Sequence, residues 1–176
     1  PHYWFDTELV QFIVGDIAQQ LSAAYPASAS QVKSATVNYQ QEILTTSDSV
    51  QKIIARIAPE QRLVITTHDA LSYFARTFGM RVQTLQGAST VSEFGLREIT
   101  ELVDFICANK VPAIFLENIV SPQAMESVQR GCQDKGFDVV LGPELLSDSL
   151  GPDADQDTYL EMLLFNATLL KTYLAR

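Results

Sequence analysis

The stretch at 63–79, LVITTHDALSYFARTFG, decides the fold class because a strand pattern runs directly into a helix pattern. The run LVIT at 63–66 is apolar and β-branched, which predicts a short buried strand. DALSYFARTFG, which ends at Gly79, has the spacing of a helix closed by glycine. A strand followed at once by a helix is the beginning of a βαβ unit.

The same alternation continues to the end of the chain. The predicted strands and helices after Gly79 cover 80–85, 95–109, 113–117, 122–131, 139–141 and 157–174, with a loop over 142–157. Strands separated by helices of roughly 10–15 residues favour a parallel sheet with helices on both faces. The sequence therefore predicts an α/β fold.

The region before this alternation is helical. Apolar residues recur with a helical period over 7–24, Pro26 ends that helix, and a long helix with a thin apolar stripe follows at about 30–57. We expect three parts: one helix in 1–27, a long connecting helix in 28–59 and a compact α/β unit in 60–176. The first two parts do not bury a core of their own, so we expect them to belong to something larger.

Composition excludes several classes of protein. The chain has 176 residues, 47% of them hydrophobic and 19% charged, and a net charge of −9. An acidic chain without a basic stripe is not expected to bind nucleic acid or an anionic membrane. It contains no apolar run near the roughly 18 residues of a membrane span. Neither the glycine motifs of nucleotide-binding loops nor the GxSxG elbow of serine hydrolases occurs.

The first residue and the two cysteines leave questions open. The chain begins at Pro1 and shows no signal-peptide pattern, so we expect a processed, trimmed or truncated product. Cys107 and Cys132 lack the spacing of a zinc finger or a CxxC motif. Each lies near the end of a predicted helix, and the two helices flank one strand, so the sequence is compatible with one bridge or with two buried thiols.

The two histidines and one aspartate are the strongest candidates for chemistry. His68 follows the strand at 63–66 and opens the next helix, with Thr66 or Thr67 as its N-cap, and the positive end of the helix dipole predicts a neutral imidazole. Asp148, in LLSDSLG, also follows a strand pattern. Loops at the carboxyl ends of parallel strands line the ligand crevice, so both side chains are expected at one rim. A capping or core histidine and a turn aspartate are the alternative interpretation.

Five segments in order then resemble the metal-binding lipoproteins and periplasmic proteins of manganese, zinc and iron ABC importers. These segments are PHYWFD (1–6), VITTHDALSYFARTFGMRV (64–82), LQGASTVSEFGLREITELVDFI (85–106), KVPAIFLENIVSP (110–122) and ELLSDSLG (144–151). The resemblance implies two α/β lobes joined by one long helix, with the metal between the lobes. It identifies this chain as the last N-lobe helix, the connecting helix and the whole C-terminal lobe.

By the same resemblance, His2, His68 and Asp148 correspond to three of the family's four metal ligands. The first ligand, a histidine early in the N-terminal lobe, has no counterpart here. Two imidazoles and a carboxylate suit Zn²⁺ and also Mn²⁺ or Fe²⁺. Histidine at position 68 resembles zinc-type members, so Zn²⁺ is favoured and Mn²⁺ is next. Further cleft or supporting residues implied are Trp4, Thr90, Ser92, Glu93 and Glu117.

The implied function is extracytoplasmic capture of a divalent transition metal, which the protein hands to the permease subunits of an ABC importer. Such a protein is not an enzyme, and it is periplasmic or lipid-anchored at the outer face of the membrane. Self-association through the surface left by the missing lobe is a further expectation. Two alternatives remain: a metal-dependent hydrolase with Glu93 or Glu117 as base, and an α/β interaction module without metal.

Overall fold

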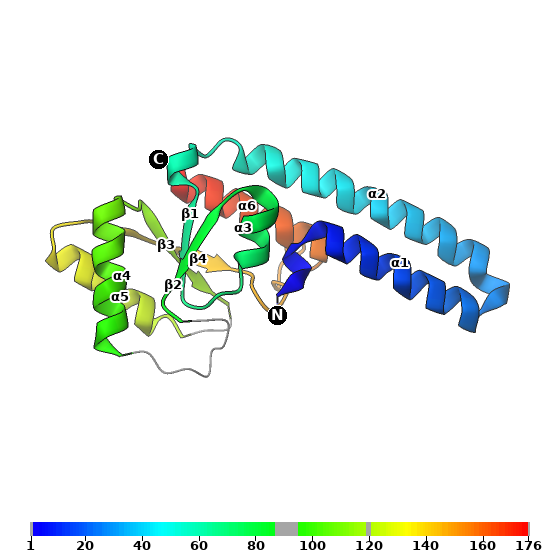
Figure 1. Ribbon diagram of the computed structural model, residues 1–176, viewed down its shortest axis with the longest axis horizontal. Coiled ribbons are helices and arrows are strands. Elements are labelled where there is room, and N and C mark those ends of the chain that lie inside the picture. The colour runs from blue at the N-terminus through cyan, green and yellow to red at the C-terminus, as the bar shows by residue number, and fades with distance from the viewer. Residues whose placement is uncertain (1, 87–94, 119–120, 176) are drawn as a thin grey trace.

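The computed structural model describes residues 2–86, 95–118 and 121–175, and it shows two regions of different character (Figure 1). Helices α1 (Thr7–Ala24) and α2 (Ala29–Ile54) run side by side as a long hairpin. The rest of the chain forms an α/β body beside the end of that hairpin that carries the start of α1 and the end of α2. Within the described residues no helix combines the length and apolar character needed to cross a membrane.

The four strands of the body are β1 (Leu63–Thr66), β2 (Arg81–Thr84), β3 (Ala113–Glu117) and β4 (Val140–Leu145). β1 pairs with β2 and β3 pairs with β4, both in parallel, and β1 also lies next to β3. The α/β class and the parallel pairing are therefore confirmed. Hydrogen bonding joins the described strands in two pairs, with a register shift between Phe115 and Leu116.

Alternate residues of the strands point into two separate cores. Val64 and Phe115 face one core, with α2, α3 (Ser72–Phe78) and α6 (Tyr159–Leu174). Ile65 and Ile114 face the other core, with α4 (Leu96–Asn109) and α5 (Gln123–Asp134). Successive strand residues point to opposite faces, so strands that are buried throughout require helices on both sides.

The last strand was predicted too short. It continues beyond the predicted end at residue 141 through Gly142 and Pro143, which the sequence had placed in a loop. Pro143 is tolerated because, among the described strands, β4 pairs only with β3, so an N–H is not needed on its other side. Gly142 lies against Phe115, and an added Cβ would come within 2.9 Å of that ring. Gly142 and Pro143, which usually favour turns, are therefore part of a closely packed strand here.

Several helix ends also differ from the predictions. α2 ends at Ile54 rather than at 57, and a short turn, Pro59–Gln61, leads into β1. Ala58 adopts the extended conformation that a following proline imposes, which stops the helix before that point. α5 continues past Gly131 to Asp134, because this glycine packs against a neighbouring helix instead of ending its own.

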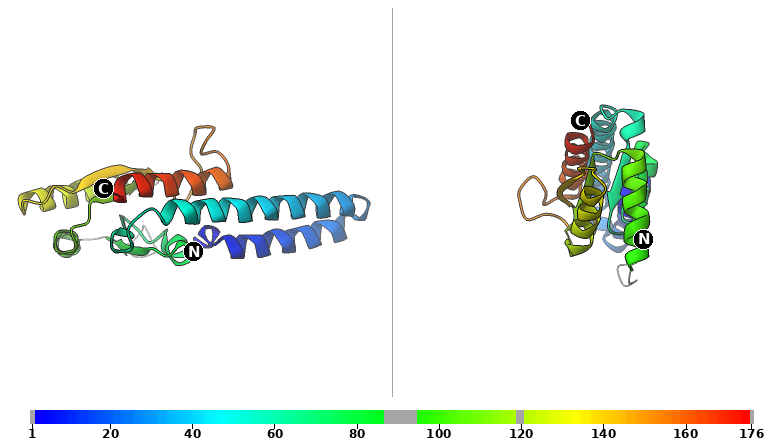
Figure 2. Two further views of the ribbon diagram at one scale, coloured as in Figure 1. Left: turned by 90° about the horizontal axis from the view of Figure 1, so that it is seen from above. Right: turned by 90° about the vertical axis from the view of Figure 1, so that its left-hand side faces the viewer.

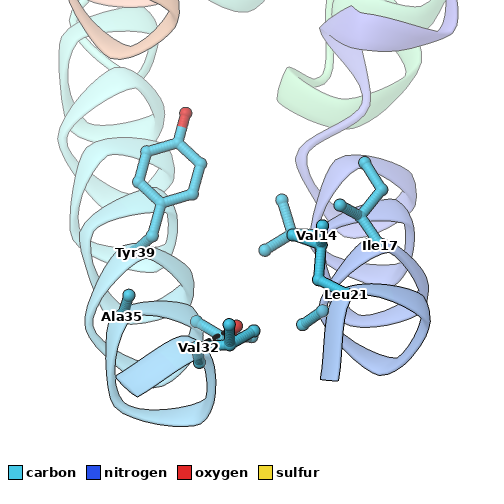
Figure 3. A pocket seen from close by; sticks show the side chains of 8 residues that line it. Val14, Ile17, Leu21, Val32, Ala35 and Tyr39 are labelled. Atoms are coloured by element: carbon cyan, nitrogen blue, oxygen red, sulfur yellow. Dashed lines mark hydrogen bonds between the residues drawn. The ribbon is translucent and has the colours of Figure 1, made fainter. Parts of the chain in front are cut away.

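The hairpin is anchored at one end and exposed at the other. The buried residues of α2, Ile43, Thr46, Val50 and Ile54, all lie in its C-terminal half, where it packs on α6. Toward the far end the two helices enclose an apolar groove (Figure 3), whose lining includes Val14, Ile17, Leu21, Val32, Ala35 and Tyr39. The connecting-helix segment is thus helical along most of its predicted length, and the hairpin extends well beyond the body (Figure 2).

Candidate metal centre

His68 lies just beyond the carboxyl end of β1 and is almost completely buried, with 1% of its surface exposed. It does not open a helix as predicted, since α3 begins only at Ser72 and its N-cap position is Leu71. The Thr66 hydroxyl donates a hydrogen bond to the His68 carbonyl at 3.0 Å, which closes a tight turn after the strand. After this turn the imidazole lies between the carboxylates of Glu117 and Asp148.

Glu117, the last residue of β3, fixes this turn through hydrogen bonds to its backbone. Its Oε2 accepts hydrogen bonds from the backbone N–H groups of Thr67 and His68, each at 3.0 Å. Its Oε1 lies 2.8 Å from Nδ1 of His68, and both side chains are buried. A carboxylate facing Nδ1 orients the ring and leaves Nε2 available to a metal ion.

The pKa of His68 is shifted in the direction opposite to that expected from a helix dipole. Hydrogen bonding to Glu117 raises the pKa of His68, although burial opposes the charged form. The negative charges of Glu117 and Asp148 act in the same upward direction. The upward shift therefore comes from the neighbouring carboxylates, and His68 does not stand at the start of a helix.

Asp148 meets both histidines. Its Oδ2 lies 3.1 Å from Nε2 of His68, and its Oδ1 lies 3.1 Å from Nε2 of His2. The carboxylate is partly open to solvent, with 24% of the side chain exposed. Asp148 follows β4 by three residues, so β1 and β4 deliver their side chains to the same rim of the body, as the sequence predicted.

His2 reaches the site through a short turn at the start of the chain. Residues Tyr3–Phe5 form one 3₁₀ turn, and Phe5 is fully buried with its ring 6.0 Å from that of Phe74. His2 itself has φ 63°, a left-handed conformation that is unfavourable for a residue with a Cβ. Its ring meets the rings of Trp4 and His68 edge to face, at 5.3 and 5.2 Å.

Trp4 ties this turn to the Asp148 loop. Its indole Nε1 donates a hydrogen bond to the carbonyl of Ser147 at 3.0 Å, and its own carbonyl accepts one from the Tyr159 hydroxyl at 2.7 Å. Trp4, one of the implied cleft or supporting residues, thus connects the His2 segment with both the loop and α6. Thr90, Ser92 and Glu93, the other expected cleft residues, lie outside the described residues.

Two asparagines that the sequence did not single out position the Asp148 loop. Asn166, fully buried in α6, accepts a hydrogen bond from the N–H of Leu146 at 2.9 Å and donates one to its carbonyl at 2.8 Å. The side-chain oxygen of Asn118 accepts a hydrogen bond from the N–H of Ser147 at 3.2 Å. A lone asparagine inside the apolar run LEMLLFNATLL was the available signal, since a buried amide needs partners.

The result is a compact set of metal-ligand atoms. One ligand atom from each of His2, His68 and Asp148 lies within 4.8 Å of the others. Two imidazole nitrogens and a carboxylate oxygen are a donor set that suits Zn²⁺ and, less selectively, Mn²⁺. Residues from the first turn, the end of β1 and the loop after β4 are therefore arranged so that one cation can contact all three.

Comparison with known proteins finds relatives that match almost the whole chain. The family described as zinc-uptake complex component A, periplasmic, matches residues 1–173. Manganese-binding lipoprotein MntA of Bacillus subtilis is 35% identical over 94% of this chain, and zinc-binding protein TroA of Treponema pallidum is 33% identical over all of it. The match covers 55% of the former protein and 58% of the latter, so the chain spans little more than half of either relative.

Solved structures show the same likeness. The periplasmic zinc-binding protein TroA superposes with a TM-score of 0.95, covering 100% of this chain and 64% of that one. A manganese-bound mutant of a periplasmic metal-binding protein from Candidatus Liberibacter asiaticus, 25% identical, superposes with a TM-score of 0.85 and covers 99% of this chain and 63% of that one. The match to nearly every residue of the sequence shows that this chain belongs to the family described as zinc-uptake complex component A, periplasmic.

Proposed function

We propose that the protein to which this chain belongs captures a divalent transition metal outside the cytoplasm and delivers it to the membrane permease of an ABC importer. The observation that carries the proposal is the convergence of His2, His68 and Asp148, three ligand-type side chains from distant parts of the sequence. The names of its relatives, a manganese-binding lipoprotein and a zinc-binding protein, support a metal cargo and a periplasmic or lipid-anchored location.

Zn²⁺ is the favoured cargo, and Mn²⁺ is next. Two imidazoles beside one carboxylate match the nitrogen-rich sites that zinc prefers. Three side chains leave a tetrahedral ion one ligand short. We propose that the fourth ligand lies outside these 176 residues, in the part of the relatives that the chain does not match.

A binding role is favoured over a hydrolytic one. Hydrolysis by a zinc-bound water requires a nearby general base. Glu117, one of the two bases considered, is buried and already accepts two backbone N–H groups while facing Nδ1 of His68. Its carboxylate therefore supports a ligand and is not free to accept a proton from water. We expect the metal-loaded chain not to turn over ester or phosphate substrates, and measurable turnover that depends on Asp148 would contradict this.

The hairpin is proposed as an association surface for a second copy when the 176-residue chain is studied by itself. Phe12, Ile17 and Val37 are 75, 50 and 58% exposed, although all three are apolar, and Ile17 also lines the apolar groove between the two helices. Exposed apolar surface of this kind is typical of regions that another protein covers. Sedimentation of the chain at several concentrations tests this, and a monomer at every concentration would reject it.

Calorimetric titration of the chelator-stripped chain with Zn²⁺ and Mn²⁺ tests the metal proposal. We expect Zn²⁺ to bind with micromolar or better affinity, and Asp148→Asn to weaken binding by roughly 100-fold or more, beyond the range usual for residues that support a ligand. Asp153→Asn is the matched control, because it makes the same change at an exposed aspartate outside the cluster. Equal losses in the two variants, or no binding by the original chain, would refute a site in these residues.

Glu117→Gln tests whether the buried carboxylate orients His68. Glutamine keeps the shape of the side chain but replaces one acceptor oxygen by an NH₂ group. That NH₂ group must then face either the backbone N–H groups of Thr67 and His68 or Nδ1 of His68, so one hydrogen-bond donor would face another. We expect metal affinity to fall by roughly 10–100-fold, with the fold retained in circular dichroism. Unchanged affinity would show that His68 keeps its position without Glu117.

A further inference from the structure

Helices α4 and α5 approach each other closely on the face of the body away from α2 and α6. A Cβ added to Gly131 of α5 would lie 2.8 Å from a methyl group of Val103 of α4, so a larger residue would force the helices apart. Cys107 lies one helical turn beyond Val103, and Cys132 directly follows Gly131. Both cysteines of the chain therefore lie where α4 and α5 approach each other closely.

The two thiols lie near each other at the crossing. Both are free, with Cys132 fully buried and Cys107 partly exposed. Lys135, directly after α5, forms a partly exposed ion pair with Asp104 of α4 near this end of the crossing. Burial raises the pKa of the Cys132 thiol to about 12, and the adjacent Cys107 acts in the same direction.

We infer that Cys107 and Cys132 are a disulfide-forming pair, which joins α4 to α5 when the folded chain meets a disulfide oxidant. The partly exposed Cys107, as thiolate, attacks one sulfur of the oxidant and releases the first oxidant thiol, which takes up the proton lost by Cys107. The thiolate of Cys132 then attacks the Cys107 sulfur of the mixed disulfide and releases the second thiol, which takes up the proton of Cys132. The two cysteines lose two electrons in total, and the oxidant disulfide is reduced to two thiols.

The geometry favours this pair for two reasons. A disulfide needs its two Cα atoms within roughly 7 Å, and a glycine at the helix crossing allows such an approach. The bond would close a loop of about 25 residues that contains β3, and cross-links of this length restrict the unfolded chain substantially. Neither argument depends on the metal centre, so the pair is tested separately from the proposed function.

The test incubates the native, metal-free chain with excess oxidised glutathione and measures its intact mass, its free thiols after denaturation and its melting temperature. We expect the loss of two hydrogen atoms, no free thiol, a linked peptide containing Cys107 and Cys132, and a melting temperature roughly 5–10 °C above that of the reduced chain. Cys132→Ala should instead retain one glutathione on Cys107.

Three results would overturn the inference. The first is a chain that gains glutathione without closing the bridge, and the second is a chain that stays fully reduced. The third is a covalent dimer on a non-reducing gel, which would place the thiols in contact with another copy. The melting comparison uses the unmodified sequence in two redox states, so it stays decisive even if Cys132→Ala fails to fold.

Discussion

The α/β body and the α1–α2 hairpin contain the same kinds of apolar residues, but the body buries them and the hairpin leaves several of them exposed. In the body, Phe74 and Phe115 are fully buried, whereas Phe12 of α1 is 75% exposed and Val37 of α2 is 58% exposed. Hydrophobic stabilisation scales with the apolar area removed from water, so the body holds most of the folding free energy. The hairpin instead exposes several apolar side chains to solvent, the basis of the proposal that a second copy covers it.

The largest effect on stability is expected from Phe74→Ala in α3, which removes a fully buried ring from the body. Phe74 packs against Phe5 and Phe78, at ring-centre distances of 6.0 and 4.7 Å. Replacing a buried phenylalanine by alanine lowers the free energy of unfolding by about 3–5 kcal/mol. Urea unfolding followed by circular dichroism measures this, and a loss below about 1 kcal/mol would show that the core repacks around the gap.

Asn166→Ala tests whether the body depends on its buried amide. The variant leaves the N–H and carbonyl of Leu146 without their partner, and each unsatisfied buried group costs about 1–3 kcal/mol. We also expect weaker Zn²⁺ binding, because Leu146 lies two residues before Asp148. Asn109→Ala, at an exposed asparagine near the end of α4, serves as control and should change stability by less than about 0.5 kcal/mol.

Asp6→Asn acts at the junction of the two regions. Asp6 caps α1 and pairs with Arg76 of α3. Burial alone would raise the pKa of Asp6, but hydrogen bonds from the N–H of Leu9, from Arg76 and from the N–H of Glu8 outweigh it and lower the pKa.

A lowered pKa means that the native chain favours the ionised carboxylate. This stabilisation is complete above the unfolded pKa of about 3.9 and is lost as the pH falls through the lower, folded value. Asparagine keeps the cap but removes the charge, so we expect a loss of about 1 kcal/mol or less at pH 7, because Arg76 is mostly exposed. The difference between the two chains should shrink as the pH falls through the lowered pKa of Asp6, and a constant difference would contradict the assignment.

Phe12→Ala should have the smallest effect. The ring is largely in water already, so its removal should change the unfolding free energy by less than about 0.5 kcal/mol. A loss close to that of Phe74→Ala would mean that Phe12 is buried against another molecule in solution. Sedimentation of the variant would then show whether that molecule is a second copy of the chain.

The alternation of strand and helix patterns predicted the α/β class, and the signal was strongest at β1 and β3, which are apolar along almost their whole length. The segment 113–117 was placed correctly to the residue. The end of β4 was missed, since Pro143 and Gly142 have turn propensities that edge position and contact with Phe115 override. His68 was placed at a helix start from local pattern alone, whereas the contact with Glu117, distant in sequence, positions its backbone and its ring.

For the candidate metal centre, the sequence by itself showed which residues have ligand-type side chains and, through strand endings, predicted that His68 and Asp148 share a rim. Only the tertiary structure decided how they meet. The Phe5 anchor brings His2 within 3.1 Å of Asp148, Glu117 raises the pKa of His68, and Asn166 holds the strand end before Asp148. Residue type and periodicity are local properties, whereas hydrogen bonds and charges between residues far apart in the chain exist only after the chain has folded.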